Sequence, residues 1–188
     1  MVKNVIRVVS GIARGRKLFG PSGLRFRPTT GRVKEFMFSY LGEIVKGARI
    51  LDLFSGTGSL GIEALSRGAE EVVFVEKSSK SLEILKRNLT LCGFVDRAVV
   101  LHGDVFHVLR RMGEKGERFD FILADPPFRG TLRDKIVKIV AESRILKPEG
   151  LLLIEHEVHD SDSETHGMEL LKQRRFGSCV VSVYGELE

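Results

Sequence analysis

The sequence predicts an α/β fold in which a mostly parallel β-sheet follows a small basic extension. Short apolar segments alternate with segments of helical spacing between residues 49 and 157, and this alternation is typical of βαβ units. Two further apolar segments flank Gly177, which indicates a terminal antiparallel hairpin. A length of 188 residues suits one domain with at most a small appendage, so we expect an extension over residues 1–46 and a main domain over residues 47–188.

The extension is expected to contain a β-hairpin, a connector and a helix. Residues 5–19 are predicted to form two short strands about the turn signals Gly11 and Gly15. Residues 21–30 are a connector rich in glycine, proline and threonine. Apolar side chains recur at helical spacing over residues 33–45, and Gly47 ends that helix.

The main domain is predicted to contain five successive strands, with a helix after each of the first four. The apolar strand segments cover residues 49–54, 71–76, 98–102, 119–124 and 150–157. The helices are expected over residues 59–67, 79–91, 104–112 and 131–143, the second ending at the cap Gly93 and the fourth starting at Thr131. A polar loop over residues 158–166 precedes the hairpin strands "LLKQRRF" and "CVVSVYGEL", which bring the sheet to seven strands.

Composition excludes several classes of protein. Hydrophobic residues make up 43% of the chain and charged residues 29%, as in a soluble globular domain. No apolar run approaches membrane-spanning length, and Arg7 interrupts the one candidate for a signal-peptide core, so we expect a cytoplasmic protein without a membrane partner. Cys92 and Cys179 form neither a disulfide framework nor a metal cluster, and both are expected to be core thiols. His156 and His159 would point to opposite faces after a strand, so no metal is expected.

The net charge of +5 is concentrated at the start of the chain. Residues 1–34 hold nine basic residues and no acid, whereas the other 154 residues hold 21 basic and 25 acidic residues. A basic arm on a mildly acidic body is typical of a protein with a polyanionic partner, although a solvated arm would have the same composition. If the partner is RNA, the residues best placed to dock its phosphates are Arg14, Arg16, Lys17, Arg25 and Arg27.

Three features lie where predicted parallel strands end, and ligands of open α/β sheets bind at such ends. The first is "LDLFSGTGSLG", with Asp52 near the end of a strand and a glycine loop that includes Gly56 and Gly58. The second is Glu76, whose carboxylate could accept two hydrogen bonds from a ribose diol. The third is Asp104, which could meet an adenine amino group or could simply cap a helix. Together these residues predict a nucleoside pocket.

The glycine loop also matches the dinucleotide fingerprint, so NAD is an alternative ligand. Gly56, Gly58 and Gly61 have the G-x-G-x-x-G spacing, and Glu76 lies 20 residues after Gly56. However, Asp52 would place a carboxylate near the pyrophosphate, whereas it would suit the ammonium group of a bound amino acid. The chain also lacks a second half-fold for the nicotinamide. These observations favour S-adenosylmethionine over NAD.

The segment "LADPPF", residues 123–128, ends the fourth predicted strand in a stiff corner. Each of the two prolines lacks an N–H and fixes φ near −65°, so neither sheet nor helix continues through them. Asp125 and Phe128 project from this corner at the end of the sheet where the nucleoside pocket is predicted. The corner could be only a turn, but a carboxylate facing such a pocket favours a catalytic role.

These motifs together carry a family resemblance. "LDLFSGTGSLGIEALSRGA", with "VE" and "DPPF" downstream, resembles class I S-adenosylmethionine-dependent methyltransferases, whose Rossmann-like sheet has seven strands. With "RVVSGIARGRKL", "LRFRPTTGRVKEFMFSYL" and "KQRRFG", the chain is similar to bacterial 16S rRNA guanine-N2 methyltransferases of the RsmD type from Arg7 to Tyr184. The resemblance adds Phe54 and Thr30 to the cofactor-binding residues. Gly31 stands where that family usually has an acid, whose role would pass to Thr29, Thr30 or Glu35.

The resemblance implies methyl transfer to a planar exocyclic amine, the N2 of a guanosine in 16S rRNA or in a small-subunit particle, by a monomeric enzyme. The Asp125 carboxylate and the Pro126 carbonyl would accept the N–H hydrogens of the amine, and Phe128 would stack on the base. The base must be unpaired or flipped out to reach such a corner. Two alternatives stay open: an N6-adenine methyltransferase acting on DNA or RNA, and a non-catalytic RNA-binding assembly factor.

Overall fold

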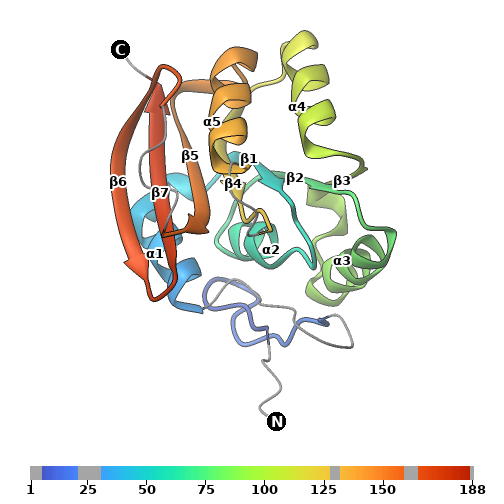
Figure 1. The fold of residues 1–188 in the computed structure, drawn as a ribbon. Coiled ribbons are helices and arrows are strands. Elements are labelled where there is room, and N and C mark those ends of the chain that lie inside the picture. Colours follow the sequence, from blue (N-terminus) through green and yellow to red (C-terminus); the bar gives the residue numbers. More distant parts are fainter. Residues whose placement is uncertain (1–5, 21–30, 128–131, 159–164, 187–188) are drawn as a thin grey trace.

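The computed structural model describes residues 6–20, 31–127, 132–158 and 165–186, which include a seven-stranded sheet covered by helices (Figure 1). The strands follow the order β3-β2-β1-β4-β5-β7-β6 across the sheet. Their bounds are β1 (Arg49–Leu53), β2 (Glu71–Glu76), β3 (Ala98–His102), β4 (Phe119–Ala124), β5 (Leu146–Glu157), β6 (Met168–Phe176) and β7 (Cys179–Glu186).

Strands β1 to β5 are parallel, whereas β7 is antiparallel to both β5 and β6. The predicted mostly parallel sheet with a C-terminal antiparallel hairpin is therefore confirmed. Connections run outward from β1 to β2 and β3, and then return to β4 on the other side of β1. The strand order thus reverses between β1 and β4, and this switch point is where open α/β sheets bind ligands.

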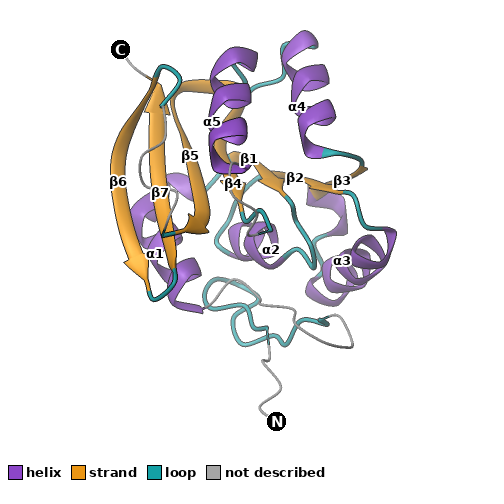
Figure 2. Ribbon diagram, viewed as in Figure 1, coloured by secondary structure: helices purple, strands orange, loops and turns teal. Residues whose placement is uncertain are grey.

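Helices cover both faces of the sheet (Figure 2). Buried side chains of α1 (Gly31–Leu41), α2 (Ser59–Ser66) and α3 (Ser79–Cys92) form one apolar cluster with one face. Those of α4 (Val105–Glu114) and α5 (Leu132–Ser143) form a second cluster with the opposite face. Successive strand residues alternate between the clusters, because side chains of a strand point to opposite faces: Ile50 belongs to the first and Leu51 to the second.

The predicted elements agree with the structure except near their ends. β2, β3 and β4 have the predicted bounds. β5 begins at Leu146, four residues before the predicted start, because its first residues include the polar segment "KPE" and so do not form an apolar run. The predicted helix over residues 33–45 ends earlier as an α-helix and continues as the 3₁₀ helix η1 (Gly42–Val45). Gly42 has φ +55°, which no α-helix contains. A second 3₁₀ turn, η2 (Val95–Arg97), precedes β3. The predicted cap Thr131 lies outside the described residues.

The predicted N-terminal hairpin is shorter than two strands. Its two halves pair only at an isolated antiparallel bridge between Arg7 and Lys17, with turns at Gly11 and Gly15 that have φ +80° and +82°. Beyond this bridge the segment is closed by a hydrogen bond from the Gly15 N–H to the Val8 carbonyl at 2.8 Å, and side chains of the main domain bind other backbone groups. Glu63 of α2 accepts the N–H groups of Val9 and Ser10 at 2.7 and 2.9 Å.

The segment 6–20 therefore packs on the main domain and is part of its core. Ile6, Val8, Ala13 and Leu18 are buried in the same apolar cluster as α1, α2 and α3. The Asn88 side chain of α3 accepts the N–H of Phe19 at 2.8 Å, and its amide donates to the Phe19 carbonyl at 3.0 Å. Across the described ranges, no helix combines the length and the hydropathy needed to cross a bilayer.

Candidate functional site

Three carboxylates come together where β1, β2 and β4 end. Asp52 of β1 pairs in register with Phe74 of β2 and with Leu123 of β4. Glu76 and Asp125 therefore lie two residues beyond the partners of Asp52, at the same edge of the sheet. Both raise the pKa of Asp52 by their negative charge, which shows that the three groups share one electrostatic site. The structure thus brings together residues that are 24 to 73 positions apart in the sequence.

Asp52 is the most perturbed of these acids. Its side chain is buried, with only 1% of the residue exposed, and its Oδ2 accepts the N–H of Gly61 at 2.9 Å. Burial is the largest of the causes that raise the pKa of Asp52 to about 8; the charges of Asp125 and Glu76 act in the same direction, and the hydrogen bond from Gly61 acts against it. A cation bound at this site would relieve the repulsion. The site therefore favours a ligand that carries positive charge.

The glycine loop between β1 and α2 is held from both sides. Ser55 donates its N–H to the Val75 carbonyl at 3.1 Å, and its hydroxyl donates to the Asp52 carbonyl at 2.7 Å. Gly56 donates its N–H to Glu76 Oε2 at 2.8 Å. Gly56 has φ +54°, and the nearest atom to a Cβ built there is the Phe54 carbonyl oxygen at 3.9 Å. There is therefore open space beside Gly56, in which a ligand could approach the backbone.

At Gly58 and Gly61, neighbouring core side chains leave no room for a Cβ, and no space is open to a ligand. A Cβ at Gly58, which has φ +83°, would lie 2.3 Å from Leu85 Cδ1, and a Cβ at Gly61 would lie 2.2 Å from Phe74 Cε1. Both neighbours are core side chains. The expectation that these glycines let the backbone pass close to a ligand therefore fits Gly56, whereas at Gly58 and Gly61 close packing against α3 and β2 explains the absence of a side chain.

Glu76 joins the two loops of the predicted ribose site. Its Oε1 accepts the N–H of Ser78 at 2.6 Å, while its Oε2 accepts the N–H of Gly56. Each carboxylate oxygen has a second lone pair, so these bonds leave capacity for hydroxyl donors. The contact with a ribose stays a prediction.

Asp104 is the N-cap of α4. Its Oδ1 accepts the N–H groups of Phe106 and His107 at 3.1 and 3.4 Å, and Lys77 Nζ lies 3.5 Å from its Oδ2. The capping alternative is thus what the structure shows, and the adenine contact stays a prediction.

Phe54, which follows β1, has φ +56°, and its ring meets the ring of Phe106 edge to face with centroids 6.3 Å apart. Sequence reasoning missed Phe106, because its helix pattern carries no ligand signal.

The proline corner follows β4 directly. Asp125 is half-buried, Pro126 is buried and Pro127 is exposed. Phe128 and Thr30 lie outside the described residues, as do Arg25 and Arg27 of the predicted RNA-docking set.

The described part of the basic arm divides into exposed and structural residues. Arg14, Arg16 and Lys17 are exposed, although Arg16 Nη1 donates to the Leu91 carbonyl at 2.6 Å. Lys34, in contrast, is only 2% exposed: its Nζ lies 3.5 Å from Glu63 Oε2 and donates to the Arg7 carbonyl at 2.6 Å. Burial lowers the pKa of Lys34, while Glu63 acts in the opposite direction. Lys34 is therefore a structural residue and cannot bind phosphate.

Sequence reasoning also missed Glu63 and Asn88, which hold the arm. Glu63 is fully buried and pairs with Arg67 at 3.0 Å in addition to Lys34. The one available signal was a lone acid in the apolar helix "SLGIEALS". Asn88 also donates to the Thr57 carbonyl at 2.9 Å, so it links the arm to the glycine loop. Within the described ranges, no three histidine, cysteine or acidic side chains gather closely enough to hold a metal ion.

Comparisons with known proteins agree with this architecture. The model of the family described as conserved hypothetical protein 95 matches residues 6–185. A relative named ribosomal RNA small subunit methyltransferase D, from Haemophilus influenzae, is 34% identical over 183 residues, which cover 97% of this chain and 94% of the relative.

Solved structures of similar chains have the same fold. A structure described as a methyltransferase from Escherichia coli superposes with a TM-score of 0.84 at 32% identity, covering 95% of this chain and 96% of the other. A methylase from Haemophilus influenzae superposes with a TM-score of 0.80 at 30% identity, covering 98% and 99% of the two chains.

Proposed function

The chain belongs to the RsmD-type family of class I methyltransferases, and from this membership we propose that it methylates the N2 amine of a specific guanosine in 16S rRNA. Its methyl donor is S-adenosylmethionine. The donor supplies an electrophilic methyl group on a positively charged sulfur. The rest of the chemistry falls to the residues of this chain.

The observation that carries the proposal is the convergence of Asp52, Glu76 and Asp125 at the switch point of the sheet. A site with three carboxylates favours a ligand that carries a sulfonium and an ammonium group, and it disfavours the pyrophosphate of a dinucleotide. The open space at Gly56 gives such a ligand access to the loop backbone. The residues present therefore fit S-adenosylmethionine.

Each cofactor-binding residue then has a proposed part. Asp52 pairs with the ammonium group, Glu76 accepts hydrogen bonds from the ribose hydroxyls, and Asp104 accepts a hydrogen bond from the adenine amino group. Phe54 contributes an aromatic wall beside the adenine, in contact with Phe106. Gly56 and Gly58 shape the loop, and Thr30 closes the methionine end of the site.

The proline corner holds the target amine. The lone pair of a guanine N2 is delocalised into the ring, so the amine is a poor nucleophile. Hydrogen bonds from its two N–H groups to the Asp125 carboxylate and the Pro126 carbonyl favour a tetrahedral nitrogen. When the donor is bound, this nitrogen would take up the methyl group from the sulfonium sulfur, and Asp125 or solvent would accept the N–H proton that the amine loses. Phe128 stacks on the base and holds it in line.

The RNA partner docks on the basic arm. Arg14, Arg16 and Lys17 present positive charge on the surface, and Arg25 and Arg27 follow them in the sequence. We expect the substrate to be 16S rRNA or a small-subunit particle, and the enzyme to act as a cytoplasmic monomer. The target base must leave its helix to reach the corner.

The test is nucleoside mass spectrometry of 16S rRNA from a strain that lacks the gene. One N2-methylguanosine should disappear, and purified protein with S-adenosylmethionine should restore it. An Asp125→Ala variant, which lacks the acceptor oxygens, should fail to restore it while binding the cofactor. Loss of an N6-methyladenosine instead would replace the guanine proposal by the adenine alternative, and no change in any methylated nucleoside would overturn both.

A further inference from the structure

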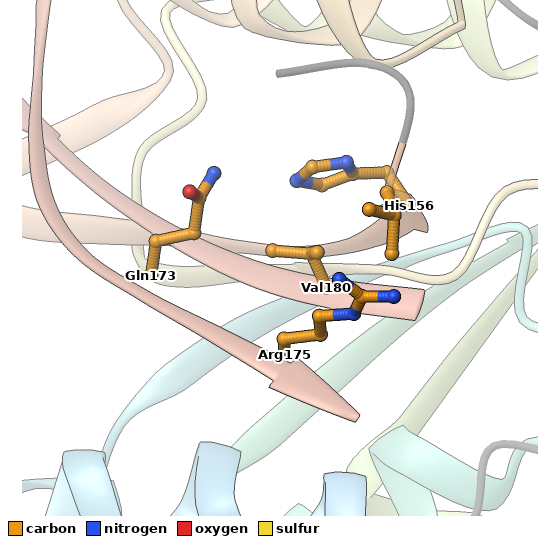
Figure 3. A pocket seen from close by; sticks show the side chains of 5 residues that line it. His156, Gln173, Arg175 and Val180 are labelled. Carbon is orange, nitrogen blue, oxygen red and sulfur yellow. The ribbon is translucent and has the colours of Figure 1, made fainter. Parts of the chain in front are cut away.

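A hollow of about 350 Å³ lies on the C-terminal part of the sheet (Figure 3). It is lined by His156 and Val158 at the end of β5, by Gln173 and Arg175 of the edge strand β6, and by Val180 of β7. His156 pairs in register with Val180, and Val180 pairs with Arg175, so these side chains share one face of the sheet. None of these residues has a part in the methyl transfer described above.

The register places the hollow beside the reacting corner. Ala124 of β4 pairs with Ile154 of β5, so Pro126 and His156 each lie two residues beyond that pair on neighbouring chain segments. Neighbouring strands are about 4.8 Å apart, so the hollow begins about one strand spacing from the end of β4 and extends across β5, β7 and β6. Nucleotides adjacent to a target base that reaches the corner would pass over this part of the sheet.

The polar groups of the hollow are held in fixed orientations. Gln173 Nε2 donates to Ser182 Oγ at 3.0 Å, and His156 Nε2 lies 2.7 Å from the same oxygen. The Gln173 amide is thus oriented by Ser182, and it has in addition a carbonyl oxygen and a second N–H. Arg175 Nε donates to the Gly177 carbonyl at 2.9 Å, which fixes the plane of a guanidinium whose terminal nitrogens carry further donors.

This combination matches one class of ligand. Val180 and Val158 supply an apolar surface for a flat ring, and the Gln173 amide offers the paired donor and acceptor that a nucleobase edge requires. Arg175 adds a positive charge and a planar fork that suits a phosphate. We propose that the hollow binds a nucleotide of the RNA substrate that flanks the methylated guanosine, and that Gln173 and Arg175 thereby determine which sequence context is accepted. This inference rests on the proposed function for the identity of the RNA.

The first test needs no methyl transfer. Methyl groups of Val180 and Val158 are observed by NMR in the whole protein while each of the four ribonucleoside 5′-monophosphates, or inorganic phosphate, is titrated. At least one nucleotide should shift both valines in a saturable manner, and Gln173→Ala should weaken that binding several-fold. If no nucleotide shifts these valines, or if phosphate alone gives the same shifts, the nucleotide site is refuted even when the enzyme methylates RNA.

The second test measures recognition in the substrate. RNA fragments centred on the methylated guanosine carry an abasic residue at one flanking position at a time. For the wild type, one abasic position should raise KM about 10-fold, which corresponds to the loss of one base contact of 1–3 kcal/mol. The same substitution should have no further effect in Gln173→Ala or Arg175→Ala. Lys172→Ala is the matched control, because Lys172 is an exposed cation of the same strand that pairs with Val183, a residue of the opposite face.

Equal sensitivity of the wild type and the Gln173 and Arg175 variants to every abasic position would contradict the proposal. So would an effect of Lys172→Ala as large as that of Arg175→Ala, since a general loss of charge would then explain both. A failure of the protein to methylate any RNA would refute the proposed function, whereas the NMR titration would still report on the hollow.

Discussion

Asp125 is the residue on which the proposed chemistry depends most directly. It is half-buried at the end of β4 and shares its electrostatic site with Asp52 and Glu76. Asp125→Ala should lower the rate of methyl transfer about 10²-fold or more, the scale of losing one preorganised polar group. The affinity for S-adenosylhomocysteine and the melting temperature should change little. Single-turnover kinetics and calorimetry measure these quantities, and near wild-type turnover would remove Asp125 from the mechanism.

The buried Asp52 predicts a dependence on pH. Burial raises the pKa of Asp52 to about 8 from a usual value of 3.8, so the folded protein binds this proton more tightly than the unfolded chain. The contribution of Asp52 to stability is therefore present in acid and is lost as pH rises from about 4 through about 8. A cationic ligand lowers this pKa again, so binding of S-adenosylmethionine at pH 7 should release protons.

Isothermal calorimetry in buffers of different ionisation enthalpy counts these protons. Asp52→Asn keeps an oxygen that can accept the Gly61 N–H, and in this variant the proton release should fall and the unfolding free energy should vary less between pH 4 and 8. If the wild type and the variant release the same number of protons, the protonation of Asp52 does not change when the ligand binds.

Among the elements, the strands were predictable from the sequence because each is a short apolar run bounded by turn residues. The same pattern could not reveal β5 before Gly150, where the sequence is polar. It also could not separate Lys34 from the other eight basic residues of the arm, because composition does not show which cation lies against a buried acid. The glycine loop was recognised from its spacing, but the roles of its glycines required the positions of Leu85 and Phe74.

The loop between β1 and α2 gives a prediction about packing. Gly58→Ala would bring a Cβ to 2.3 Å from Leu85 Cδ1, so it should destabilise the cofactor-free protein by about 1–3 kcal/mol, as overpacked cores do, with backbone strain in addition. Gly56→Ala is the matched control, since it has a similar positive φ and only one neighbour, at 3.9 Å. Urea unfolding of the two variants compares these costs. If the two variants lose the same free energy of unfolding, backbone strain, and not the contact with Leu85, accounts for the cost of replacing Gly58.

For the molecule as a whole, the charge distribution predicts how RNA binding depends on salt. Each lost phosphate contact should make the plot of log affinity against log salt shallower by about 0.7 for single-stranded RNA. Replacing the exposed Arg14 and Lys17 by glutamine should therefore flatten this slope and weaken binding, without changing the affinity for S-adenosylmethionine. Replacing Arg110 and Arg111, which are exposed on α4 across the sheet, is the control of equal charge. Identical slopes for both double variants would mean that the arm is only a solvated surface.

The anchoring of the arm also has a consequence for the order of events during protein synthesis. Residues 6–20 leave the ribosome before α2 and α3 do, but the backbone groups of Val9, Ser10 and Phe19 are bound by Glu63 and Asn88, which are made more than 50 residues later. The arm of the nascent chain therefore cannot take its final shape until α2 and α3 have emerged. The cations of the arm take up their fixed spacing only then. The surface that we expect to bind rRNA therefore forms together with the glycine loop, not before it.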